Sequence, residues 1–129
     1  MRLAIAARIT IRISGVLLIG LGLLFWTGNA DQLIPVHEVL GFVLVIALWT
    51  LAFLAARAGV SIGLVALAVV WGLVAPFNGL GQRELLTGSW HWLIQVIHLL
   101  IGLGAVGLGE MLARAIGARE AGARLVRTT

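Results

Sequence analysis

The chain lacks cysteine and lysine altogether and carries little charge of either sign. Without cysteine, the protein has no disulfide bond, no thiolate metal site and no covalently attached c-type haem. Asp, Glu, Lys and Arg together make up only 11% of the 129 residues, whereas soluble domains reach about 25%. This shortage of charge argues against a water-soluble fold.

The sequence is instead rich in apolar residues. They make up 61% of the sequence, and the mean hydropathy is +1.12. About 20 helical residues cross a bilayer core of about 30 Å, and the first and third apolar runs reach this length only with flanking residues. The N-terminal segment also resembles a signal peptide, but we expect it to stay as the first membrane helix. The expected helices cover 13–27, 33–56, 60–77 and 90–113, with a cytoplasmic tail over 114–129.

Short connections separate these runs, so neighbouring helices should run antiparallel. Pro35 stands at the first turn of the second run, where its missing N–H costs nothing. The stretch 76–89 forms a longer third connection rich in glycine. The sequence therefore predicts an all-α fold: one domain that is a polytopic membrane bundle of four helices in up-down order.

The arginines indicate the orientation of this bundle. Arg83 alone lies on the side of the first and third connections. By the positive-inside rule, both termini should be cytoplasmic, and we expect an integral protein of a bacterial inner membrane. The pI near 11.7 is then a topology signal and does not indicate nucleic-acid binding. The other eight basic residues lie on the side of the termini: Arg2, Arg8, Arg12, Arg57, Arg114, Arg119, Arg124 and Arg127.

One glycine pattern suggests a nucleotide site that the context excludes. The string "GLGAVG" at 102–107 matches GxGxxG, but that fingerprint works only between a strand and a helix. Within an apolar run, small residues instead let membrane helices approach closely. The pairs Gly59 with Gly63 and Gly15 with Gly22 have the same interpretation, and such faces also suit a homo-oligomer.

Two spans carry histidine within the apolar runs. In the fourth span, His91, Gln95, His98 and Gly102 fall on one helical face. The second span repeats the pattern H-x-x-x-G with His37 followed by Gly41. Strongly polar side chains at membrane depth are costly and usually face the interior of a bundle or a cavity. These residues are therefore the candidates for a functional site.

The chain also resembles a tandem repeat of two helical hairpins. Each half ends with a helix that carries H-x-x-x-G, so the copies would be related by an axis along the membrane normal. His37 and His98 would then lie at matching positions on the second and fourth helices. In an up-down bundle these helices are diagonal partners.

Two imidazoles facing each other across an apolar bundle are the ligands that six-coordinate haem requires. Gly41 and Gly102, one turn from the two histidines, would leave room for the flat macrocycle. Arg83 is a candidate partner for a haem propionate, and its alternative interpretation is a solvated charge in the loop. His91 and Gln95 would lie further out, within hydrogen-bonding reach of the cofactor edge or of water. A haem held at this height is on the extracytoplasmic side.

The strings "VHEVLG" and "IHLLIG" resemble transmembrane b-type cytochromes, including the cytochrome b subunits of quinol-oxidising complexes, which hold haem between the second and fourth helices of a bundle. The resemblance implies one haem b and electron transfer near the outer face, with quinone or other membrane subunits as partners. The larger members carry two histidines on each of these helices, whereas the second helix here has only His37. One haem is therefore the maximum.

Other interpretations stay open at this stage. Measured from the cytoplasmic arginines, His37 lies about 30 Å out, between His98 at about 24 Å and His91 at about 34 Å, so either could be its partner. The histidines could instead serve helix packing in a structural or accessory subunit. With Glu38 they could hold zinc or copper.

Smaller features of the sequence are also ambiguous. Trp49 and Trp71 could pack against a porphyrin or simply against other helices, and Glu110 should pair with Arg114 one turn later. No nucleophile and base occur together, so a stand-alone enzyme is less well supported than an electron-transfer or accessory protein.

Overall fold

The computed structural model describes residues 1–28 and 30–128, without the side chains of residues 127 and 128. Four long helices make up nearly all of this part of the chain, which contains no strand: α1 (Arg2–Phe25), α2 (Ile34–Arg57), α3 (Ile62–Gly81) and α4 (His91–Thr128). Short 3-10 turns, η1 (Asp31–Leu33) and η2 (Gly88–Trp90), precede α2 and α4. The predicted all-α fold with four helices is confirmed.

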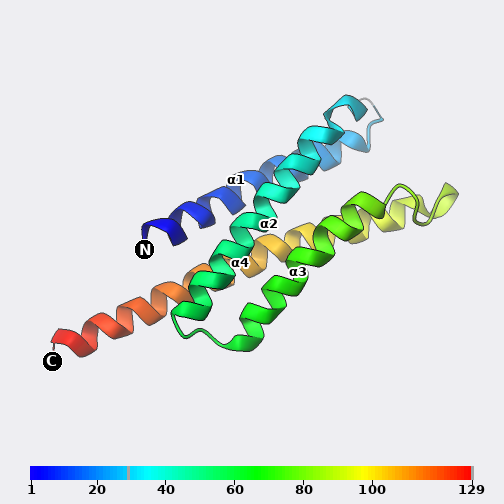
Figure 1. Cartoon of the computed structure of the whole chain (residues 1–129). Helices are drawn as coiled ribbons and strands as arrows, with labels where there is room; N and C mark the ends of the chain where they lie inside the picture. The colour runs from blue at the N-terminus through cyan, green and yellow to red at the C-terminus, as the bar shows by residue number, and fades with distance from the viewer. Residues whose placement is uncertain (29, 129) are drawn as a thin grey trace.

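Each long helix is apolar and long enough to cross a membrane, counting η1 with α2 and η2 with α4. Consecutive helices run antiparallel, and both termini lie at the same end as the connection between α2 and α3 (Figure 1). The other two connections lie at the opposite end, which we call the loop end. Helix α2 contacts α1, α3 and α4, and α4 also contacts α1 and α3. The expected diagonal contact between α2 and α4 is therefore present.

The packed core lies in the half of the bundle near the termini. On α2, one face is almost completely buried from Leu44 to Ala55. It meets Ile11 of α1, Ala68 of α3 and Leu112 of α4, each with at most 1% of its surface exposed. Beyond Leu44, towards the loop end, few side chains are buried. The interior of the loop end is therefore available for something other than core packing.

Glycines allow the close helix contacts of this core. A Cβ at Gly15 would lie 2.7 Å from Val106, and one at Gly109 would lie 2.6 Å from Ile11, so α1 and α4 meet where a side chain is missing. Gly104 has the same role against Trp71. The expectation of close approach fails for Gly63, which faces open space, and for Gly59, whose φ of +74° ends α2 in a turn.

Two tryptophans form hydrogen bonds that join α3 to α2 and to α4. The indole N–H of Trp49 donates to the carbonyl of Val69 at 3.2 Å, and that of Trp71 donates to the carbonyl of Ile101 at 2.8 Å. Neither indole lines the cavity described below. Of the two possibilities for these residues, the structure therefore favours helix packing.

Helices α1, α3 and α4 are longer than the apolar runs that predicted them, whereas α2 has the predicted length. Helix α1 begins at Arg2 instead of residue 13, and α4 continues to Thr128 instead of ending at 113. The predicted tail is thus helical, because residues 114–128 are rich in alanine and arginine, which favour helix. Helix α3 passes through Pro76 and ends at Gly81 instead of residue 77, and Pro76 removes only the backbone bond to Gly72.

Charged side chains join α1 to α4 near the termini. Glu110 accepts hydrogen bonds from Arg8 at 2.7 Å and from Arg12 at 2.6 Å. The predicted pairing of Glu110 with Arg114 was wrong, because the α1 extension brings two guanidinium groups to the carboxylate from across the bundle.

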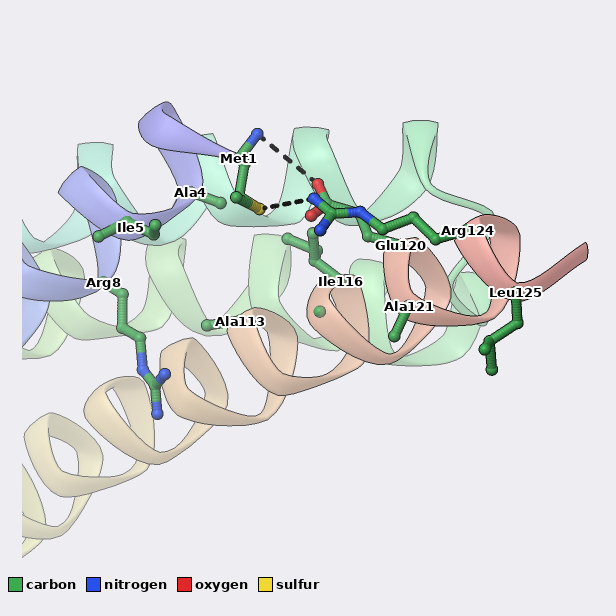
Figure 2. Close-up of a pocket in the computed structure, with 11 residues that line it drawn as sticks. Met1, Ala4, Ile5, Arg8, Ala113, Ile116, Glu120, Ala121, Arg124 and Leu125 are labelled. Carbon is green, nitrogen blue, oxygen red and sulfur yellow. Dashed lines mark hydrogen bonds and ion pairs between the residues drawn. The ribbon is translucent and has the colours of Figure 1, made fainter. Parts of the chain in front are cut away.

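The first turn of α1 lies against the extension of α4 (Figure 2). The amino group of Met1 lies 3.6 Å from a carboxylate oxygen of Glu120. A cleft of about 570 Å³ opens beside this contact, with Ile5 and Ile116 among its apolar walls. The extension of α4 is thus attached to the bundle through its contacts with α1.

The contact at Gly104 predicts a position-specific loss of stability. Gly104→Ala would place a methyl group against the Trp71 ring, which its hydrogen bond holds in place, and should lower the free energy of unfolding by about 1–3 kcal/mol. Thermal melting in detergent micelles measures this. The matched control is Gly107→Ala on the same helix, where a Cβ meets nothing within 4 Å and the better helix propensity should raise stability by up to about 1 kcal/mol. Equal effects of the two substitutions would contradict this packing.

The Glu110 cluster predicts a second difference. Glu110→Gln should lower the Tm by several degrees, because it leaves two guanidinium groups without their counter-charge. Glu120→Gln is the matched control, since its one ion pair is longer and joins two more exposed groups. It should leave the Tm almost unchanged. The expectation fails if the Tm of the Glu110 variant equals that of the Glu120 variant.

Candidate functional site

A cavity of about 390 Å³ lies inside the loop end of the bundle, with residues of all four helices in its walls. Its size falls in the range of cofactor and small-molecule sites, about 300–1,000 Å³. All seven residues expected to form a site line it: His37, Gly41, Arg83, His91, Gln95, His98 and Gly102.

Two histidines face each other across this part of the bundle. The ring centroids of His37 on α2 and His98 on α4 are 6.1 Å apart, and the ring planes are inclined by 46°. His91 lies about two turns further out on α4 than His98, and its Nδ1 is 3.4 Å from the carbonyl oxygen of Leu85. Of the two possible partners, His98 is therefore the one whose ring lies beside that of His37.

Helix α3 holds the His98 ring. Its Nδ1 lies 3.1 Å from Oδ1 of Asn78. A Cβ at Gly79 would come within 2.9 Å of Cε1 of the same ring, so the imidazole occupies the space that a side chain there would need. The sequence prediction missed Asn78, because it placed the end of α3 at residue 77 and assigned "PFNG" to a loop. The signal was the position of "PFNG" in the second hairpin, which matches that of "FWTGN" in the first.

The surroundings of His37 are different. Its ring meets Phe25 of α1 edge to face, with centroids 5.3 Å apart. Its Nδ1 is buried and has no hydrogen-bond partner, and it is the one such side-chain atom in the part of the chain that the structure describes. Leaving a buried polar group unpaired costs about 1–3 kcal/mol, and His37, unlike His98, has no protein group that offsets this cost.

Two glycines keep the cavity open. A Cβ at Gly41 or at Gly102 would meet no atom within 4 Å. These glycines therefore border empty space, in contrast to Gly15, Gly104 and Gly109 in the core. The sequence had grouped Gly102 with the helix-packing glycines as well as with the site, and only the second role fits.

The cavity is polar towards its outer end and apolar below. Arg83, just beyond α3, is exposed at the outer end, together with Glu38 and Gln95 in the lining. Leu44 and Ala105 form its inner boundary and also belong to the core. Such a site can accept a flat apolar group whose charged substituents reach outward.

The arrangement does not form a conventional metal cluster. Among residues 1–28 and 30–128, no three His, Cys, Asp or Glu side chains come close enough together to hold an ion. The suggested zinc or copper site of His37, Glu38, His91 and His98 is therefore not assembled. The imidazoles of His37 and His98 are the pair of donors that lies close together in the cavity.

Comparison of the chain with protein-family models, characterised proteins and solved structures found no match. The likeness to b-type cytochromes therefore rests on the two histidine motifs, and the function has to be argued from the cavity itself.

Proposed function

We propose that the protein is an integral membrane haem protein that holds one haem b between His37 and His98 and carries electrons. The observation that supports this most directly is the placement of two imidazoles across one cavity, with ring centroids 6.1 Å apart. The other residues around the cavity agree with it in three respects.

The first is the spacing of the rings. A metal bonds imidazole nitrogen at about 2 Å, so two ligands on opposite sides of an iron place their nitrogens about 4 Å apart and their ring centres about 6 Å apart. The separation of His37 and His98 agrees with this value. Packed rings in direct contact also have centroids about 4.5–7 Å apart, so this spacing permits ligation of one metal by both rings without requiring it.

The second is the shape of the cavity. Gly41 and Gly102 stand one turn from the two histidines and leave open space beside each, as the edge of a broad ring requires. Apolar side chains from α1 and α2, such as Leu18 and Phe42, contribute to the walls. They would exclude water from the macrocycle and so influence its potential.

The third is charge. Arg83 lines the outer end of the cavity, where it would pair with a propionate, although the same lining includes the acidic residues Asp31 and Glu38. Haem bound here would supply a one-electron carrier. The chain would hold it through two imidazoles, exclude water with the apolar walls and orient it through Arg83.

The membrane orientation belongs to the same proposal. Eight of the nine arginines lie on the side of the termini, and the cavity lies at the opposite, loop end. With the termini in the cytoplasm of a bacterium, the site faces the outer leaflet of the inner membrane. Quinone or another membrane subunit could then exchange electrons with it.

An optical spectrum tests the haem. Protein purified from haem-replete cells should show sharp haem b bands in the reduced-minus-oxidised spectrum. The bis-histidine form of these bands should disappear in both His37→Ala and His98→Ala, because each substitution removes one axial ligand. His91→Ala is the matched control and should keep them, because the His91 ring does not face His37. A folded wild-type preparation that stays colourless with added haem overturns the proposal.

One observation favours a second candidate, a structural or accessory subunit. The bond from His98 to Asn78 and the contact of His37 with Phe25 join helices without any cofactor. In that case His98→Ala should lower the Tm of a colourless protein, and the native protein should be isolated together with other chains. Metal analysis of the same sample tests for a zinc or copper site.

A further inference from the structure

We propose that Asn78 is a positioning residue that makes His98 the anchoring ligand of the site and leaves His37 as the exchangeable one. This inference rests on the proposed function, because it assigns unequal roles to the two histidines of that site. It follows from a difference between the two rings that their matching sequence motifs do not suggest.

The first step is the protonation pattern of His98. The Oδ1 atom of an asparagine side chain only accepts hydrogen bonds. In the amide orientation that brings this atom 3.1 Å from Nδ1 of His98, the proton of the neutral imidazole lies on Nδ1. The Nε2 atom then keeps its lone pair, which is the form that binds a metal.

The second step is the orientation of the His98 ring. It lies against Gly79 so closely that a Cβ there would come within 2.9 Å of the ring. Asn78 and Gly79 are consecutive residues of α3, so the same turn of helix supplies the hydrogen bond and the flat surface. A partner of this kind fixes a ligand ring and makes its nitrogen a better donor.

The third step is the absence of such support at His37. Its Nδ1 is buried without a partner, and the nearest ring is the apolar Phe25. A Cβ at Gly22 on α1 would lie 4.0 Å from Cε1 of His37, which is an ordinary contact distance. The His37 ring is therefore not pressed against a helix backbone in the way that the His98 ring lies against Gly79. No acceptor fixes the tautomer of this ring or strengthens its nitrogen as a donor, so its bond to iron should be the weaker of the two.

If the two histidines bind haem unequally, replacing each of them by alanine should have a different effect on haem retention. His37→Ala should retain haem through His98 and give a five-coordinate, high-spin spectrum that binds carbon monoxide. His98→Ala should lose most of its haem. Two equivalent ligands would give the same loss in both variants, which would overturn the inference.

Asn78 itself is tested by substitutions that act in opposite directions. Asn78→Leu removes the acceptor and should weaken haem affinity by about 10–100-fold and raise the reduction potential. Asn78→Asp keeps an acceptor oxygen with more negative charge, so it should retain haem and lower the potential. A purely structural role for Asn78 does not predict shifts of opposite sign. Thr50→Val is the control, because it removes a polar group that bonds only the carbonyl of Ile46 on its own helix.

A measurement without haem separates this inference from the proposed function. In ¹⁵N-histidine spectra of the cofactor-free, full-length protein in micelles, His98 should show one tautomer with the proton on Nδ1, and His37 should not. Asn78→Leu should abolish this preference. If wild-type protein takes up no haem, the proposed function fails and the assignment of ligands fails with it. If haem binds but the Asn78→Leu and Thr50→Val proteins behave alike, only the role of Asn78 is overturned.

Discussion

The contact between α2 and α4 is the constraint on which the rest of the structure depends. Helix α2 touches all three other long helices, and its buried face meets α4 in the half of the bundle near the termini. Leu44 and Ala105 mark the outer limit of this packing, and His37 and His98 each lie seven residues beyond them. The two imidazoles therefore lie at about the same height, two helical turns or about 10 Å beyond the packed core.

The halves of the chain repeat each other at the histidines but differ in what supports them. In the first hairpin, α1 presents Phe25 to its histidine, whereas in the second, α3 presents Asn78. The local pattern H-x-x-x-G is identical. The surroundings of the two histidine rings therefore differ because the first helix of each hairpin supplies a different neighbour.

Much of this was predictable from the sequence, since apolar runs identify the helices and a seven-residue spacing identifies one face of a helix. All seven residues that the sequence proposed for the site are among those that line the cavity. The same reasoning missed Asn78, because proline and glycine in "PFNG" suggested that α3 had ended. It also assigned Glu110 to Arg114, a neighbour in sequence, because the partners Arg8 and Arg12 come from the other end of the chain. Contacts of this kind depend on tertiary packing, which a local pattern does not contain.

The one-sided position of the cavity has a consequence for the proposed haem protein. The proposal places one haem at the outer end and no second carrier in the packed core below Leu44 and Ala105, so an electron that enters at the outer face would leave by the same face. Its path then runs parallel to the bilayer plane and crosses little of the transmembrane voltage. A charge that traverses the whole membrane changes in energy by about 2.3 kcal/mol per 100 mV. Electron exchange at this site would instead move almost no charge across the membrane. Its rate would therefore not depend on the membrane potential.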